Sequence, residues 1–139
     1  MNEISGKEEI RDKEVAIKIL GNKDNLLKCT PNVTKVEGNK FTAEMKMGPL
    51  QIELEGEIRD FQVLNNEVKN VIEVSGPGII ITINTNVKVE DKYVEWHASY
   101  DVRGPLSNAI RKTIDSKAKE VTKEIIACTL SLINVSNNS

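Results

Sequence analysis

Apolar and polar residues follow two different spacings along this chain. From Val33 to about Arg103, apolar residues recur at every second position, in runs separated by short turn sequences. This period of two predicts half-buried β-strands. No helical segment lies between the runs, so neighbouring strands should be antiparallel, because a parallel pair needs a long crossover connection. The spacing then changes to that of a helix, which we expect to run from Pro105 to Ile133.

Turn residues mark the ends of the predicted strands. Glu37-Gly38-Asn39 joins the first two strands of this meander, and Gly48-Pro49 leads into the third. Asn65-Asn66, Gly76-Pro77-Gly78 and Asp91-Lys92 close the later hairpins. In the third strand one face is apolar and the other carries carboxylates, so we expect one face of the sheet to meet a core and the other to meet water.

The N-terminal part of the chain predicts one strand and two short helices. Asn2 to Ile10 reads as a polar strand, which brings the sheet to six or seven strands. Helical spacing follows from Lys13 to Leu20, and Gly21 is a common helix-ending residue. A second helical turn from Asn22 to Lys28 must end before Pro31, which cannot extend it. These two helices should pack as a corner against one end of the sheet.

One face of the long helix is expected to lie against the concave side of the sheet. At 3.6 residues per turn, this face comprises Leu106, Ile110, Thr113, Ile114, Lys117, Val121, Ile125, Cys128 and Leu132. Thr113 and Lys117 interrupt it near the middle, which is unexpected in a dry core. Lys117 either reaches water or a carboxylate at an edge, or orients the polar head of a bound ligand. Asp115 is assigned to the outer surface, at the spacing of an ordinary ion pair with Lys119.

The end of this helix, residues 125–133, is apolar around most of its circumference. It is too short to span a bilayer. Either the two N-terminal helices cover it, or it presents an apolar patch to another copy of the chain, a partner or a membrane surface. We expect it to be covered, with a homodimer as the next alternative.

Length and charge narrow the functional classes. The 139 residues suit a single domain, which we place at residues 1–134, followed by a short polar tail at 135–139. A net charge of −2 gives no general attraction to phosphate backbones, so nucleic acid is not an expected partner. No apolar run approaches the roughly 20 residues of a transmembrane helix, and the first residues lack the features of a signal peptide. We therefore expect a cytoplasmic protein without a transmembrane segment.

Few residues offer catalytic or metal-binding chemistry. Cys29 and Cys128 are far apart in sequence and only His97 could join them, whereas a zinc site needs about four converging ligands. We expect two buried free thiols, with a disulfide or a reactive Cys29 as the alternatives. His97 falls on the polar face of the last strand, where a solvated side chain is expected. The sequence thus predicts no metal site, no cofactor and no catalytic residue.

Trp96 and Tyr100 are the most informative aromatic residues. They share the inward face of the last strand, and each carries one polar atom, which suits a core residue or a pocket wall. A single helix cannot fill a strongly curved sheet, so a cavity tends to remain between helix and sheet, and apolar cavities bind small molecules. The pattern therefore directs attention to ligand binding.

Several short motifs resemble those of one known family. They are Gly6 in the first strand, Leu20 with Asp24-Asn25-Leu26-Leu27, Cys29-Thr30-Pro31-Asn32, Gly48-Pro49 with Gly56, and Val102-Arg103-Gly104-Pro105-Leu106. Together with the order of the elements, they make the chain similar to the CoxG family of carbon monoxide dehydrogenase subunits, within the START-like superfamily. The resemblance implies a helix-grip fold of the α+β class, in which a curved antiparallel sheet surrounds a long C-terminal helix. Asn32 stands where the family usually has glycine.

The resemblance also implies a function. Family members look like non-catalytic accessory proteins of carbon monoxide dehydrogenase or related molybdenum hydroxylases, cytoplasmic or peripheral at the inner face of the membrane. The implied ligand is a hydrophobic small molecule, such as a lipid or a quinone. The alternatives are a cyclase- or hydrolase-type enzyme that uses Lys117 and Tyr100, and a scaffold that docks through its C-terminal helix. The residues expected to line the cavity are Phe41, Met45, Leu54, Ile72, Ile81, Ile83, Trp96, Tyr100, Ile110, Ile114, Lys117 and Val121.

Overall fold

The structure is a computed structural model that describes residues 2–47, 49–105 and 107–136. Strands make up most of it, and the longest helix comes last in the chain. The elements follow in the order β1 (Asn2–Glu9), α1 (Lys13–Leu20), α2 (Lys23–Cys29), β2 (Val33–Glu37), β3 (Lys40–Met47), β4 (Leu50–Leu64), β5 (Glu67–Gly76), β6 (Ile79–Val89), β7 (Tyr93–Arg103) and α3 (Ser107–Ser136).

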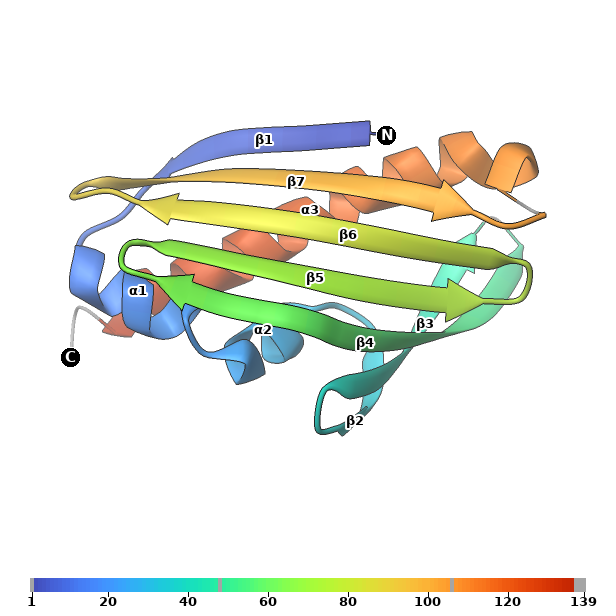
Figure 1. The fold of residues 1–139 in the computed structure, drawn as a ribbon, viewed down its shortest axis with the longest axis horizontal. Coiled ribbons are helices and arrows are strands. Elements are labelled where there is room, and N and C mark those ends of the chain that lie inside the picture. The colour runs from blue at the N-terminus through green and yellow to red at the C-terminus, as the bar shows by residue number, and fades with distance from the viewer. Residues whose placement is uncertain (1, 48, 106, 137–139) are drawn as a thin grey trace.

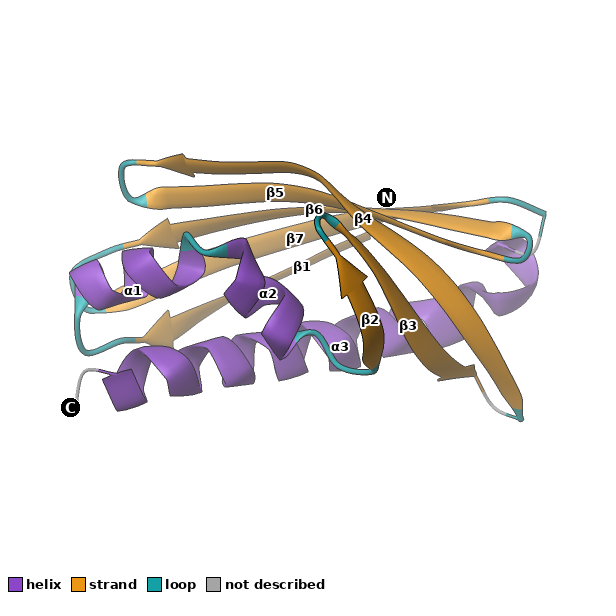
Figure 2. Cartoon of the chain, turned by 90° about the horizontal axis from the view of Figure 1, so that it is seen from below, coloured by secondary structure: helices purple, strands orange, loops and turns teal. Residues whose placement is uncertain are grey.

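The described strands form one seven-stranded antiparallel sheet in the order β1-β7-β6-β5-β4-β3-β2 (Figure 1). Strands β2 to β7 are a meander of neighbours, and the first strand returns to pair with the last. All three helices lie on one face of this sheet, with the long α3 running beneath it and α1 and α2 beside one end of α3 (Figure 2). The predicted α+β helix-grip arrangement is confirmed.

Local capping explains where the two short helices begin and end. The Asp12 carboxylate accepts hydrogen bonds from the first backbone N–H groups of α1, at 2.9 and 3.1 Å. Asn22 caps α2 in the same way, with Oδ1 3.0 Å from the backbone nitrogen of Asp24. Gly21 ends α1 as predicted, and Thr30 has extended backbone where Pro31 stops α2. The short helices therefore follow from their own sequences.

Two family motifs contain residues with backbone that few side chains tolerate. Asn32 has a φ of 65°, the left-handed region in which asparagine is the commonest substitute for glycine. This explains why asparagine can stand at a position where the family usually has glycine. Gly104 has a φ of 112°, and a Cβ there would lie 2.5 Å from the carbonyl oxygen of Gly78. The turn at Gly104 delays the helix, which begins at Ser107 rather than at Pro105 and continues to Ser136 rather than Ile133.

The buried side chains form three clusters between the sheet and the helices. The Trp96 cluster joins α1, β6, β7 and the end of α3 through Ile10, Ala16, Val87, Val89, Val94, Trp96 and Ile133. The Tyr100 cluster lies towards the start of α3 and comprises Ile79, Ile81, Tyr100, Val102 and Ile114. The Phe41 cluster lies under α2 and comprises Leu27, Phe41, Ala43 and Ile58.

The apolar end of α3 is covered, as expected. Ile126 and Leu130 pack against the Trp96 cluster, in which Ile133 is almost completely buried. This cluster includes the fully buried Ala16 of α1 together with residues of β6 and β7. This end of the helix is therefore part of the core.

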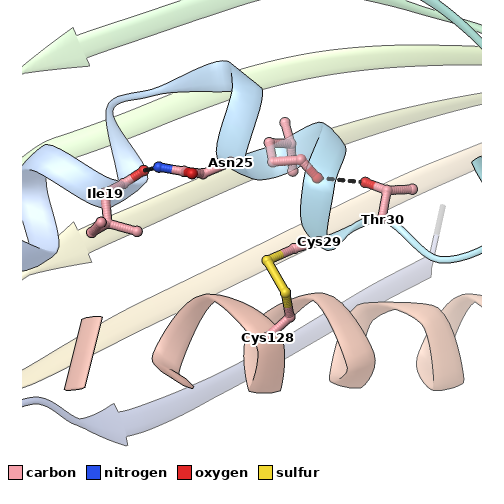
Figure 3. Close-up of a disulfide and its surroundings, with 6 residues drawn as sticks. Ile19, Asn25, Cys29, Thr30 and Cys128 are labelled. Carbon is pink, nitrogen blue, oxygen red and sulfur yellow. Dashed lines mark hydrogen bonds between the residues drawn. A yellow bond between two sulfur atoms is a disulfide. The ribbon is translucent and has the colours of Figure 1, made fainter. Parts of the chain in front are cut away.

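The expectation of two free thiols is wrong, because Cys29 and Cys128 form a disulfide between α2 and α3 (Figure 3). The two residues are 99 positions apart, and their Cα atoms are 5.5 Å apart. Nothing local in the sequence indicates this proximity, which exists only after α2 has packed against α3. The Asn25 side-chain amide donates to the carbonyl of Ile19, 3.0 Å away, and so ties α2 back to α1. The disulfide thereby fastens the whole N-terminal corner to the long helix.

Reduction of this disulfide should destabilise the protein strongly. A cross-link that closes a loop of about 100 residues stabilises by roughly 4–5 kcal/mol in the chain-entropy model, because it restricts the unfolded chain. Urea unfolding with and without a phosphine reductant should show a clear drop in the midpoint. The double variant Cys29→Ser/Cys128→Ser is the control, since its midpoint should already be low and should ignore the reductant. An unchanged wild-type midpoint would show that the bond does not form.

Candidate functional site

The concave face of the sheet carries most of the residues predicted to line a cavity. Phe41, Leu54, Ile81, Trp96, Tyr100 and Ile114 are buried, while Met45, Ile72, Ile83, Lys117 and Val121 are half-buried. The side chain of Ile110 lies outside the described residues. Tyr100, Ile81 and Ile114 meet in one cluster, against which Met45 and Ile83 pack. Phe41 is part of the Phe41 cluster, and Ile72 packs against that cluster. Trp96 is part of the Trp96 cluster.

Eight of the twelve predicted residues are therefore divided among three clusters, and Leu54, Lys117 and Val121 belong to none of them. Two depressions on the described part of the protein are lined by none of the predicted residues. One, of about 570 Å³, lies at the β1–β7 end and is lined by Lys7, Glu8, Glu9, Ile10, Lys92 and Tyr93. The other, of about 430 Å³, lies between α2 and β2 and is lined by Asp24, Leu27, Lys28, Thr30, Val33 and Val36. A cavity lined by the predicted residues stays a prediction.

Two aromatic rings of this face lie over glycines on the neighbouring strand. Gly6 is the cross-strand partner of Trp96, and a Cβ at Gly6 would be 2.6 Å from the Trp96 ring. Gly56 is the partner of Phe41, and a Cβ there would overlap the end of the Phe41 ring. Aromatic rings of this kind fill the space that a glycine leaves in a sheet. The glycines that carry the family resemblance thus make room for aromatic residues of the concave face.

The hydroxyl of Tyr100 forms a hydrogen bond with α3. Its hydroxyl donates a hydrogen bond of 2.8 Å to Oδ1 of Asp115, and its side chain is 4 % exposed. Burial, and then this contact with Asp115, raise the pKa of Tyr100 to about 12. The assignment of Asp115 to the outer surface is therefore wrong. The carboxylate is half-buried and holds the first half of α3 against β7.

The inward face of α3 is rotated from the predicted one. Thr113 is exposed, which corrects its placement on the concave side, whereas Ala118, Ile126 and Leu130 pack against the clusters. The apolar stripe is broad, so its centre could not be located from spacing alone. Lys117 is 32 % exposed, and its Nζ lies 3.4 Å from Oε2 of Glu120. Of its two predicted roles, the structure supports pairing with a carboxylate at an edge.

A bulge in β4 brings Phe61 to the concave face, which the alternation did not predict, and places it beside Asn70 of β5. The register between β4 and β5 shifts between Ile58 and Asp60, so that Phe61 and not its neighbours packs against the Phe41 cluster. Phe61 pairs with Asn70, a polar residue that is only 7 % exposed. An asparagine among the apolar alternate positions of β5 was a sequence signal that could have drawn attention to this position.

The outer face of the sheet carries ordinary surface chemistry. His97 is exposed, as predicted, and its Nε2 lies 3.6 Å from a carboxylate oxygen of Glu3. Within the described ranges there is no cluster of three or more His, Cys, Asp or Glu residues that could hold a metal ion.

The fold and the apolar concave face define a helix-grip protein of the START-like class, a ligand-binding fold. A conserved protein from Geobacillus kaustophilus has a similar structure, with a TM-score of 0.66, 14 % identity and 95 % of both chains covered. A norcoclaurine synthase variant from Thalictrum flavum, in complex with a transition-state analogue, gives 0.63 at 11 % identity over 99 % of this chain and 96 % of that one. The structure of Ara h 8.0201 gives 0.56 at 13 % identity over 94 % and 98 %. At these identities the likeness concerns the fold.

The family model for the carbon monoxide dehydrogenase protein CoxG matches residues 6–134, and the chain belongs to this family. A comparison of this chain with curated protein sequences found no match. Among the residues that the structure describes, no helix combines the length and the apolar character needed to cross a membrane.

Substitution of Gly56 by alanine should disturb the Phe41 cluster. The new Cβ occupies the place of the Phe41 ring, which must move within a packed core, so we expect a loss of about 1–3 kcal/mol in the free energy of unfolding. Urea unfolding measures it. The double variant Gly56→Ala/Phe41→Leu should recover part of the loss, because the smaller side chain leaves room. Equal stability of Gly56→Ala and wild type would contradict the close contact.

Tyr100→Phe should cost about 1–2 kcal/mol of stability at neutral pH, because it removes a hydrogen bond to a half-buried carboxylate. The pKa of Tyr100 is raised in the folded state, from 10.0 to about 12. The contribution of the hydroxyl is therefore complete below pH 10 and is lost as the pH rises towards 12. The stability difference between wild type and Tyr100→Phe, measured by chemical unfolding, should shrink in that range. A constant difference would refute this account.

Proposed function

We propose that this protein is a non-catalytic binding protein that holds a hydrophobic small molecule, such as a lipid or a quinone, between its sheet and α3. The observation that carries the proposal is the apolar concave face of a ligand-binding fold. That face joins residues of β3 to β7 with one side of α3, and its Phe41 and Trp96 rings are held over glycines. Apolar pockets with few polar groups are the usual sites for such ligands.

The depression between α2 and β2 is a candidate entrance for a ligand that binds between the sheet and α3. It is lined by Leu27 and Val33, which also belong to the Phe41 cluster or pack against it. Leu27 and Val33 therefore face both the depression and the Phe41 cluster. The outer rim of the depression carries Asp24 and Lys28, so the route would begin in water and lead to the apolar cluster.

The side chains that an enzyme could use are engaged elsewhere. The Tyr100 hydroxyl donates to Asp115, and the Lys117 ammonium pairs with Glu120 at the edge of the helix. Catalysis in such a cavity would need convergent titratable groups. A non-catalytic binding role therefore suits the concave face better than a cyclase or hydrolase role.

Membership of the CoxG family supports an accessory role for a carbon monoxide dehydrogenase or a related molybdenum hydroxylase. In this role the protein would work in the cytoplasm or at the inner face of the membrane.

Disulfides persist mainly in oxidising compartments, although intracellular proteins of hyperthermophiles also contain them. Trapping of free thiols in intact cells, followed by mass measurement, reports whether Cys29 and Cys128 are oxidised there. Genes for molybdenum hydroxylases beside the gene for this chain would support the accessory role.

Native mass spectrometry of the purified protein tests ligand binding. The wild type should carry an apolar molecule that is released on denaturation. Ala98→Leu should lose it, because the larger side chain projects from the concave face beside Thr85 and Ile4. Ser99→Leu is the matched control, since the neighbouring residue faces the other side of the sheet. A wild type that carries no ligand and takes up no added lipid or quinone would refute the proposal.

A further inference from the structure

One row of residues crosses the concave face between the Trp96 cluster and the Tyr100 cluster. Backbone pairing places its members side by side on successive strands, in the order Ile4, Ala98, Thr85, Asn70 and Phe61. Ile4 packs against both clusters, which shows that the row lies between them. We call it the central row.

The middle of the central row has smaller side chains than the rows on either side. On one side of it the paired residues include Val87 and Trp96, and on the other Ile83 and Tyr100. The middle of the central row holds only Ala98, Thr85 and Asn70. On α3, Val121 and Ile125 are half-buried but belong to none of the three clusters. On β5, β6 and β7 the central row therefore has the least side-chain volume of the three rows.

Asn70 is the unusual member of the row. It is 7 % exposed, and its side-chain Oδ1 is buried without a hydrogen-bond partner. The residues before and after it on the same face of β5 are the buried Val68 and the half-buried Ile72. A buried polar atom without a partner costs more free energy than a net hydrogen bond returns, so such atoms in native proteins call for a specific explanation.

We infer that Asn70 is the polar anchor of the internal ligand site, and that the ligand is a neutral, mostly apolar molecule with a hydroxyl group that donates a hydrogen bond to Asn70 Oδ1. This inference rests on the proposed function and adds the chemistry of the ligand. The ligand is neutral because every member of the central row is uncharged, so nothing in it would balance a buried charge. The Thr85 hydroxyl, next to Asn70 across the strands, can donate to the oxygen of the same group.

A pair of probes that differ in one hydroxyl tests the anchor. Binding of 2-naphthol and of naphthalene is measured by equilibrium dialysis with the full chain. The partition of the two probes into an apolar solvent gives the ratio of affinities expected without a hydrogen bond. Wild type should bind 2-naphthol about fivefold better than this ratio predicts, because one neutral hydrogen bond contributes about that much. Asn70→Leu should remove this preference while still binding naphthalene. Asn84→Leu, on the outer face of β6, is the matched control and should keep it.

The outcomes separate the anchor from the proposed function. Equal preference in wild type and Asn70→Leu, with both probes bound, overturns the anchor and leaves the proposed function standing. Binding of neither probe by wild type overturns both. Unfolding of the ligand-free proteins supplies a second measurement, because Asn70→Leu removes an unpartnered polar atom and should match or exceed the wild-type midpoint. A much lower midpoint would show that Asn70 is satisfied within the protein, by a structural water for example, and would overturn the anchor.

Discussion

The rest of this structure depends on a mismatch of widths: one helix has to cover a seven-stranded sheet. Seven strands spaced by about 4.8 Å extend over roughly 29 Å, whereas a helix with its side chains is only about 10 Å across. The protein meets this constraint with the curvature of the sheet and the corner formed by α1 and α2 (Figure 2). Aromatic rings placed over glycines fill further space. The result is three separate apolar clusters.

Two contacts hold α3 in place along its length. Towards its start, Asp115 accepts the hydrogen bond of Tyr100 from β7, and towards its end Cys128 is joined to Cys29 of α2. Between them, Ala118 packs against the Tyr100 cluster and Ile126 against the Trp96 cluster, while Val121 and Ile125 are half-buried and belong to none of the three clusters. A hydrogen bond and a disulfide thus supplement the apolar packing that holds α3 against the sheet and the short helices.

The candidate site was predictable in part. The faces of β6 and β7 follow from simple alternation, so the inward positions of Ile81, Trp96 and Tyr100 could be read directly. Phe61 was missed because a bulge shifts the alternation in the middle of β4, and a bulge leaves no reliable mark in the sequence. Asp115 was misplaced because a broad apolar stripe does not define the rotation of a helix to within one residue.

The sequence by itself determined the strands, their faces, the caps at Asp12 and Asn22, the family, and through these the helix-grip fold. These features depend on interactions between residues that are close in the chain, or on a period that every strand repeats. Only the tertiary structure decided that Cys29 meets Cys128, that Tyr100 meets Asp115, and that Asn70 lies buried without a partner. Each of these depends on how the sheet curves and how the helices rotate against it, and packing of the whole chain sets both.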